Sequence, residues 1–455
     1  MEGILGKING LVWGIPALAL ILGVGAYLSI RTNWAQMRLL PKALKTLAEG
    51  LHKDKSDSSF RALCTALAAT VGTGNIAGVA GAIAIGGPGS IFWMWVSALF
   101  GMVTKFAEAT LSVRYRYRDP GGEWMGGPMY VMEFGMGKTW RPLAICYCLF
   151  GVVAAFGVGN GTQVNAVVDS VDTVLRVFGS KSSPRIAVLI GGCMAALAGC
   201  CLLGGAKRIG DVAELLVPVA AVAYIVLCVG AVGVHAQKIP AALRSIVTGA
   251  FSPLAVTGGV IGSAFTALRV GASRGVFTNE AGMGTAGIAH GQSRVNHPAQ
   301  QGLMGIVEVF LDTLVICTLT ALVILTSGAE IRYGLDEGAT LTSRAFSMTY
   351  GPWVSIPMAL FLCCFAFATM LGWGLYGLRC AQYLFGKKAC KIFVAVQILA
   401  AAASGFLKTG VIWLLSETVN GLMAIPNLIC IAALSPELIR LTREYTKKKS
   451  AERSS

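Results

Sequence analysis

Thr70-Val71-Gly72-Thr73-Gly74-Asn75 decides the fold of this chain, because it interrupts a long apolar stretch with glycines and hydrogen-bonding side chains. Glycine favours departures from helical geometry, and threonine and asparagine side chains replace backbone partners that a broken helix loses. Such a break exposes carbonyls that bind a cation and amides that bind a carboxylate. The alternative is that these small residues only permit close packing, but an unpaired Asn75 amide in hydrocarbon would be costly. We therefore predict a discontinuous helix.

The composition of the whole chain indicates a membrane protein. Its 455 residues are 55% hydrophobic and only 13% charged, and the mean hydropathy is +0.68. A soluble domain has roughly a quarter of its residues charged, and a β-barrel would show alternating hydrophobicity instead of continuous apolar runs. We predict an all-α membrane protein with about eleven transmembrane helices. These spans are expected at residues 11–30, 62–86, 90–112, 143–172, 186–203, 209–234, 257–290, 302–327, 353–384, 389–406 and 410–433.

The net charge of +15 is explained by topology rather than by nucleic acid. Lys and Arg lie between the predicted spans, with 23 on one side of the membrane and 9 on the other, and they form no single stripe with interleaved aromatic residues. This bias predicts an external N-terminus and a cytoplasmic C-terminus. The 13 cysteines lie mostly within apolar runs and show no metal-type spacing, so we interpret them as packing residues.

A second interrupted span begins near Gly258-Gly259 and ends at Asn279-Glu280-Ala281-Gly282-Met283-Gly284. Its charged side chains need partners or water at membrane depth. We expect Glu280 to pair with Arg274 or Lys105 as a structural or gating ion pair; the alternatives are that it carries a proton or contacts a substrate amine. Lys105 and Glu108, three residues apart, are predicted to form a structural pair.

The two interruptions occupy corresponding places in two sets of five spans. Each lies in the first helix of its set, at residues 62–234 and 257–433. This arrangement is typical of a transporter built from an inverted repeat. The remaining segments are an extra helix with a basic segment at residues 1–61, an external linker at 235–256 and a cytoplasmic tail at 434–455.

Three motifs resemble signatures of the alanine or glycine:cation symporter family, part of the amino acid-polyamine-organocation superfamily. They are residues 68–79, Gly126-Gly127-Pro128-Met129-Tyr130 and residues 279–284, in that order. The resemblance implies a LeuT-like 5+5 inverted repeat preceded by one extra helix, with substrate between two discontinuous helices and sodium beside it.

Residues 71–75 are also similar to the first broken helix of sodium-coupled neurotransmitter symporters, and that likeness implies roles for residues at the first break. The amides of Thr73 and Gly74 would take a substrate carboxylate, and the carbonyls of Ala68 and Val71 would take sodium. Asn75 would ligate the cation or orient the substrate. Sodium is a hard ion that suits such oxygen ligands.

Residues elsewhere in the chain complete the implied site. Thr369 and the carbonyl of Ala366 are sodium candidates, although the Thr369 hydroxyl could instead bond back to its own helix. Gln163 would contact substrate or join helices, and Trp373 would wall the pocket or simply pack. The second interrupted helix supplies three further substrate-binding candidates: Phe265, Thr266 and Gly271.

The predicted function is sodium-coupled symport of a small neutral amino acid, alanine or glycine, across a bacterial-type inner membrane. Sodium is the only metal expected, with no other cofactor, no nucleic acid and no obligate protein partner. The alternatives are a proton-coupled transporter with Glu280 as the carrier, or a channel or receptor. An enzyme is not expected, because neither a nucleophile with a base nor a metal motif is visible.

Overall fold

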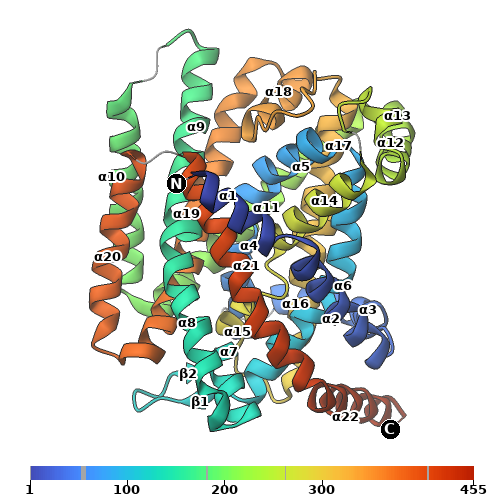
Figure 1. Ribbon diagram of the computed structural model, residues 1–455. Coiled ribbons are helices and arrows are strands. Elements are labelled where there is room, and N and C mark those ends of the chain that lie inside the picture. Colours follow the sequence, from blue (N-terminus) through green and yellow to red (C-terminus); the bar gives the residue numbers. More distant parts are fainter. Residues whose placement is uncertain (1, 53–57, 181–182, 262, 407–408, 455) are drawn as a thin grey trace.

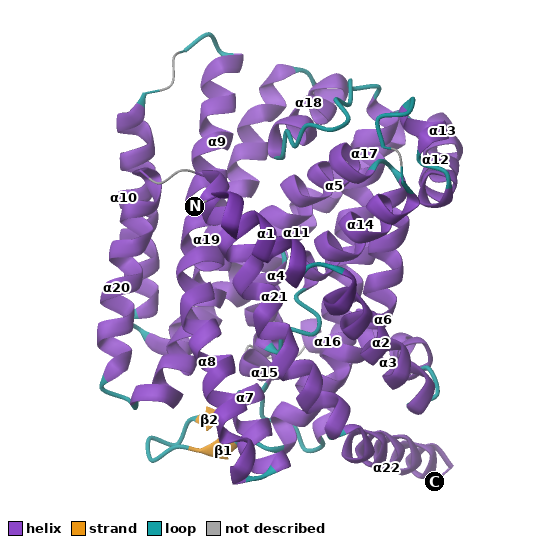
Figure 2. Cartoon of the chain, in the orientation of Figure 1, coloured by secondary structure: helices purple, strands orange, loops and turns teal. Residues whose placement is uncertain are grey.

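The structure is a computed structural model of the full chain, and it describes residues 2–52, 58–180, 183–261, 263–406 and 409–454. In the described part, eight helices are long and apolar enough to cross a membrane, and a bent helix pair makes a ninth. Two of the eleven predicted spans fail this length and composition criterion. One is the second interrupted span, and the other is the 15-residue helix α20 (Ala389–Ala403). Apart from one short hairpin, the bundle is helical (Figure 2).

The N-terminal segment forms three helices on the outside of the bundle. The first two pack against α6 and α21, and the third is an amphipathic helix along α16. Their bounds are α1 (Glu2–Val12), α2 (Ile15–Arg31) and α3 (Ala35–His52).

The first predicted repeat contains a broken helix followed by four continuous spans. A small antiparallel hairpin lies between its second and third spans, with Tyr117 opposite Met125. The elements are α4 (Ser58–Thr70), π-helix η1 (Gly74–Gly78), α5 (Val79–Gly86), α6 (Gly89–Arg114), β1 (Tyr117–Arg118), β2 (Trp124–Met125), α7 (Pro128–Tyr130), η2 (Val131–Met136), η3 (Lys138–Trp140), α8 (Arg141–Phe156), η4 (Gly157–Gly161), α9 (Thr162–Val177), α10 (Pro184–Leu202) and α11 (Gly205–Val234).

The predicted linker at residues 235–256 is largely helical. It holds η5 (Ala236–Lys238), α12 (Ile239–Phe251) and the start of α13 (Leu254–Thr257). The next long helix begins only at Ala264, because the Ser263 hydroxyl caps it by accepting from the Phe265 amide at 3.1 Å. The second interrupted span therefore starts later than the predicted residue 257.

The second predicted repeat follows, together with a C-terminal helix. Its second span passes through a π-helical segment, and a short helix precedes its third span. The elements are α14 (Ala264–Asn279), α15 (Thr285–His290), α16 (Pro298–Val309), η6 (Phe310–Cys317), α17 (Thr318–Ser327), α18 (Ala339–Tyr350), η7 (Pro352–Val354), α19 (Ser355–Phe385), α20, η8 (Ser404–Phe406), α21 (Thr409–Ala433) and α22 (Ser435–Ser454).

Close helix packing at small residues holds the centre of the bundle together. Helices α14 and α16 both pack along α6. Gly305 of α16 lies so close to α6 that a Cβ there would stand 2.7 Å from the Lys105 carbonyl oxygen. Membrane helices commonly associate through such contacts, because lipid provides no hydrophobic drive between them.

The two ends of the bundle carry different elements. One end, here the α18 end, carries α18, α12 and α13, and the opposite end, here the α22 end, carries the β hairpin and α22 (Figure 1). Helices α10 and α20 lie side by side at the edge of the bundle. The two broken helices lie at the centre of the bundle, between these two ends.

Candidate functional site

The first interruption lies where the sequence predicts it. Helix α4 ends at Thr70, and the helical path resumes at Gly74, bent by 52°. The side chain of Asn75 turns back into the gap, where its Oδ1 accepts from the Gly72 amide at 2.8 Å. An asparagine side chain therefore replaces a backbone acceptor at the break.

This rearrangement releases two carbonyls of the main chain. In a continuous α-helix the Gly72 amide would donate to Ala68, and the Asn75 amide would donate to Val71. Here the Gly72 amide donates to the Asn75 side chain, and the Asn75 amide donates to the Gly72 carbonyl at 3.2 Å. The carbonyls of Ala68 and Val71 thus lose their ordinary helical donors.

Helix α19 lies directly against this break. A Cβ at Gly72 would stand 2.7 Å from Thr369 Oγ1, so only glycine fits at this contact. Thr369 is 2% exposed and its hydroxyl has no hydrogen-bond partner among the described residues. The bond back to its own helix, considered above as an alternative, is therefore not formed. Ala366, one turn earlier in α19, is fully buried. A buried hydroxyl without a described partner, packed against the residue at the break, is the kind of oxygen that suits a hard cation.

The predicted substrate residues Thr73 and Gln163 contact each other. Thr73 donates from its hydroxyl to Gln163 Oε1 at 3.3 Å, and the Gln163 amide nitrogen donates to the Val158 carbonyl at 3.0 Å. The contact is buried, with Thr73 2% and Gln163 4% exposed. Gln163 therefore faces the start of η1, where the leading amides of a helix lack intrahelical partners.

Thr278 is a threonine of α14 that faces the first break. A Cβ at Gly74 would lie 3.3 Å from its hydroxyl oxygen, which itself donates to the Arg274 carbonyl. The sequence analysis missed Thr278, although it stands immediately before the Asn279 motif. The two broken helices thus meet at Gly74 and Thr278.

The second interruption occupies residues 280–284. Glu280 adopts a left-handed backbone conformation with φ of 54°, and α15 starts at Thr285. The Glu280 carboxylate accepts from the Trp373 indole nitrogen at 2.7 Å and from the Thr285 hydroxyl at 2.7 Å. The prediction that Glu280 pairs with Arg274 or Lys105 is wrong, because neither cation lies within ion-pair distance of it in the described structure. Its bond instead fixes the fully buried Trp373 ring.

Glu108 of α6 closes the second break. Its Oε1 accepts from the amides of Gly282 and Gly284 at 2.8 and 3.1 Å and from the Asn427 side chain at 2.8 Å. The predicted structural pair of Lys105 with Glu108 is also wrong, since Lys105 forms its ion pair with Glu308 at 2.7 Å. The exposed amides of this break are therefore satisfied by the protein itself.

Asp312 of η6 connects the two breaks. It is fully buried and accepts from Asn75 Nδ2 at 2.7 Å and from the Thr313 hydroxyl at 2.8 Å. Asn279, at the end of α14, donates to that hydroxyl at 3.1 Å. No Lys, Arg or His of the described chain lies within 4.0 Å of the Asp312 carboxylate. An isolated carboxylate at such depth requires a compensating positive charge or a proton.

The remaining candidates of the second interrupted helix lie away from this region. Phe265 is 47% exposed, one residue after the start of α14, and some 21 Å along the helix from Asn279. Thr266 is its neighbour on the same turn. Gly271 packs against α6 at Ser90 and Trp93. The structure therefore does not bring Phe265, Thr266 and Gly271 together with the other substrate candidates, and their role stays a prediction.

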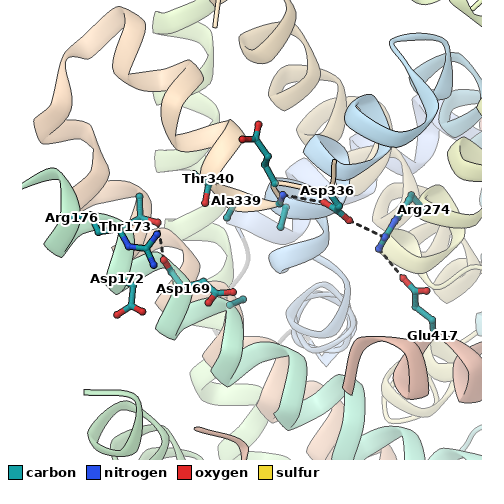
Figure 3. A pocket seen from close by; sticks show the side chains of 14 residues that line it. Asp169, Asp172, Thr173, Arg176, Arg274, Asp336, Ala339, Thr340 and Glu417 are labelled. Carbon is teal, nitrogen blue, oxygen red and sulfur yellow. Dashed lines mark hydrogen bonds and ion pairs between the residues drawn. The ribbon is translucent and has the colours of Figure 1, made fainter. Parts of the chain in front are cut away.

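A cavity of about 430 Å³ opens at the α18 end (Figure 3). It reaches the first broken helix at Ala77 and Gly78. On its wall, Arg274 lies between Glu417 and Asp336, with N–O distances of 2.9 and 3.5 Å. Arg274 thus joins α14 to α21 and to the loop before α18. The predicted gating or structural role of Arg274 stays a prediction, and its ion-pair partners are Glu417 and Asp336 rather than Glu280.

A second cavity, of about 750 Å³, opens at the α22 end. Helix α4 contributes Ala62 and Thr65 to its wall, and α15 contributes Ala289. The other halves of the two broken helices, η1 and α14, line the first cavity. Thr73, Asn75 and Trp373 line neither cavity and are at most 2% exposed. The described structure therefore has a closed centre with a cavity approaching from each end.

Four buried titratable residues around the breaks were missed or misassigned from the sequence. The sequence shows these residues as ionisable side chains within or beside apolar runs, which indicates that they are buried. It does not show their partners, which lie on other helices. They are Glu108, His290, Glu308 and Asp312, and all are at most 3% exposed.

Two helices broken at the bundle centre, between cavities from opposite ends, define a multi-pass transporter of the LeuT type. The solved structure of MhsT in complex with L-phenylalanine has this fold and matches with a TM-score of 0.59 at 15% identity, covering 85% of this chain and 98% of MhsT. The predicted all-α membrane fold of the LeuT type is confirmed, whereas the predicted number of about eleven spans stays a prediction. The sequence also matches the sodium:alanine symporter family across residues 1–455, and the chain belongs to that family.

Related proteins agree with this membership. The sodium/alanine symporter AgcS of Methanococcus maripaludis is 40% identical over 451 residues, covering 97% of this chain and 96% of AgcS. An uncharacterised transporter of Haemophilus influenzae is 41% identical, covering 98% and 97% of the two chains. The probable sodium/glutamine symporter GlnT of Bacillus subtilis is 37% identical, covering 99% and 92%. The chain is thus a sodium-coupled amino acid symporter of the membrane.

Proposed function

We propose that this symporter imports a small neutral amino acid, alanine or glycine, by alternating access across a bacterial-type inner membrane. The excess of Lys and Arg on one side of the membrane supports an orientation in which the α22 end is cytoplasmic and the N-terminus is external. In that orientation the cavity at the α18 end, which Arg274 lines, faces the outside of the cell. In this proposal sodium is the coupling ion, and transport needs neither another cofactor nor a protein partner.

The observation that carries the proposal is the set of oxygens around Gly72. The carbonyls of Ala68 and Val71 lose their helical donors, and the Thr369 hydroxyl has no described partner. We assign sodium to these oxygens, with the Ala366 carbonyl as a further ligand on α19. Asn75 contributes through its side chain, which ties the break to Asp312.

The substrate carboxylate binds beside this sodium, at the amides of Thr73 and Gly74. Backbone amides at the start of a helical segment carry partial positive charge and favour an anion. Gln163 meets Thr73 at this place and supplies a hydrogen-bonding group. Trp373, held by Glu280, limits the space available to the substrate side chain.

The size of the substrate side chain is what the names of related proteins address. A relative called a sodium/alanine symporter supports alanine, whereas a relative called a probable sodium/glutamine symporter indicates that larger substrates occur in related chains. One methylene changes binding by only about 1–3 kcal/mol. The test is counterflow in proteoliposomes with a panel of glycine, L-alanine, D-alanine, serine and glutamine, each with and without sodium. Saturable exchange of alanine or glycine with sodium supports the proposal; preferred exchange of glutamine overturns the assigned substrate.

A second candidate function is coupling to protons, and the isolated buried carboxylate of Asp312 favours it. The carboxylates of Glu280 and Asp312 both lie within the bundle without an ion pair in the described structure. Uptake that follows an imposed pH gradient at a fixed sodium gradient would support a proton carried alongside sodium. In that case, Asp312→Asn should abolish pH-driven uptake if Asp312 carries the proton. Loss of pH-driven uptake in Glu280→Gln instead would assign the proton to Glu280, the carrier considered from the sequence.

A further inference from the structure

An unbroken chain of buried hydrogen bonds links the start of α4 to α6 through α16 and α15. Ser59 donates from its hydroxyl to Gln301 Oε1 at 2.6 Å, and Gln301 Nε2 lies 2.7 Å from His290 Nδ1. His290 Nε2 lies 3.0 Å from Glu308 Oε2, and Lys105 donates to Glu308 Oε1 at 2.7 Å. Ser59 is 8% exposed and the other four side chains are fully buried. None of the five belongs to the proposed sodium or substrate site.

The donors and acceptors of this chain allow one consistent assignment. Gln301 Oε1 accepts from Ser59, so Gln301 Nε2 faces His290 and can only donate. His290 Nδ1 therefore accepts, and Nε2 carries the ring proton that it donates to Glu308. The second oxygen of Glu308 takes the Lys105 ammonium group. Each bond fixes the direction of the next, and removal of one member leaves buried polar atoms without partners.

The helices that this chain ties together are the α22-end halves of both broken helices. Ser59 stands in the first turn of α4, which precedes the first break, and His290 is the last residue of α15, which follows the second break. Gln301 lies between them on α16. Separation of α4 from α15 must break the Ser59–Gln301 or Gln301–His290 bond.

The cavity at the α22 end lies beside the contact between α4 and α15, so separation of these helices would open a path for substrate release. Ala62 and Thr65 of α4 and Ala289 of α15 form part of its wall, and Ala289 is adjacent to His290. In the described structure the cavity stops short of Thr73 and Asn75. Movement of α4 away from α15 would extend the cavity toward the first break.

We propose that Ser59, Gln301, His290, Glu308 and Lys105 form a latch that holds the cytoplasmic end of the pathway closed. Gln301 and His290 are positioning residues: they hold α4 against α15 and touch neither sodium nor substrate. This inference rests on the alternating access and orientation given under the proposed function. Loss of the central bonds shifts the conformational equilibrium toward the state open to the cytoplasm.

A native cysteine provides the readout. Cys64 of α4 is fully buried, and the tryptic peptide that follows Arg61 contains it as its single cysteine. Its alkylation by a membrane-impermeant maleimide, added to inside-out membrane vesicles without sodium or substrate and quantified by peptide mass spectrometry, reports access from the cytoplasmic side. A role confined to general stability would not change this rate in a protein that remains folded.

The variants break the latch at its centre. His290→Leu and Gln301→Leu replace hydrogen-bonding side chains by apolar ones of similar size, and we expect the Cys64 rate to rise about 10-fold in each, the effect of roughly one lost buried hydrogen bond. His290→Gln retains a donor and an acceptor and should return the rate to within about 2-fold of the native value. The matched control is His235→Leu, which removes a histidine–threonine bond of 3.0 Å to Thr349 at the α18 end and should leave the rate unchanged.

Unchanged Cys64 labelling in both leucine variants, with monodisperse protein, overturns the latch. If both variants fail to fold, Ser59→Ala removes the hydroxyl that donates to Gln301 and leaves the Gln301 bond to the Ser59 carbonyl, so a rise of about 3-fold or none decides the question. Sodium-dependent alanine counterflow by the native protein is measured in parallel. Counterflow without a labelling change refutes the latch alone, whereas a labelling change without counterflow refutes the proposed substrate and coupling alone.

Discussion

The two broken helices differ in how their main-chain groups are satisfied. At the second break, Glu108 accepts from the amides of Gly282 and Gly284, so a carboxylate of the protein occupies the place that an anionic ligand could take. At the first break, the carbonyls of Ala68 and Val71 lose their helical donors, and the Thr369 hydroxyl, which packs against Gly72, has no described partner. The comparison supports the proposal that sodium and substrate bind at the first break, whereas the amides of the second break are satisfied by the protein itself.

Loss of the Glu108 carboxylate should have the largest effect, because it satisfies three donors at once. In Glu108→Ala, two amides and Asn427 lose their acceptor, at a cost of about 1–3 kcal/mol each when buried. This total is a large part of a typical stability of about 5–15 kcal/mol. We expect little monodisperse protein and a strongly lowered melting temperature by size exclusion and thermal unfolding.

The matched variant for this position is Glu108→Gln, which retains an acceptor oxygen and should fold. If the alanine variant melts like the native protein, the second break does not depend on this carboxylate.

Gly72→Ala should disable the first break with the fold retained. A Cβ there would stand 2.7 Å from Thr369 Oγ1 and fill the space assigned to sodium. We expect sodium-stimulated alanine uptake to fall more than about 10-fold, the effect of losing one interaction with a charged ligand. Gly23→Ala, in a helix where an added Cβ meets nothing within 4 Å, is the control and should transport normally. Normal sodium-stimulated uptake by the Gly72 variant would remove sodium from this place.

Thr369→Ala tests one ligand oxygen with a smaller change. The sodium concentration for half-maximal uptake should rise about 10-fold, since one oxygen of the ion's coordination is lost, and expression should not change. Thr369→Ser keeps the hydroxyl and should behave like the native protein. Uptake that depends on sodium equally in the alanine and native proteins would refute the role of this hydroxyl.

Phe265→Ala should have the smallest effect. The side chain is 47% exposed at the far end of α14 from the second break, so uptake kinetics should change by less than about 2-fold. Trp373→Ala serves as the contrast, because that ring is fully buried and bonded to Glu280. A large loss of substrate affinity in the Phe265 variant would restore it to the site.

The sequence predicts the first break better than the second, for a local reason. Gly72, Gly74 and Asn75 lie within four residues of one another. The close contacts that require glycine occur at Gly72 and Gly74, and the Asn75 side chain accepts from the Gly72 amide in the same short segment. In the second interrupted span, glycines at 258, 259, 271, 275, 282 and 284 compete as signals of a break. The cap at Ser263 and the left-handed Glu280 decide among them, and neither follows from glycine content.

Partners of buried charges were not predictable from spacing. Lys105 and Glu108 are separated by one helical turn, yet each has its partners on other helices: Glu308 for the lysine, and the second break for the glutamate. Asp312 was missed for the same reason, because its significance comes from Asn75, 237 positions away in sequence. Helical periodicity describes neighbours on one helix, whereas these pairs depend on the tertiary arrangement.

The most direct test of the account is equilibrium binding of alanine and sodium to the purified protein by titration calorimetry. If sodium at the first break orders the amides that take the carboxylate, sodium must raise alanine affinity, and alanine must raise sodium affinity by the same factor. We expect this reciprocal factor to be about 10-fold or more, and in Thr369→Ala to be reached only at a sodium concentration about 10-fold higher. Alanine binding of equal strength with and without sodium would contradict the account.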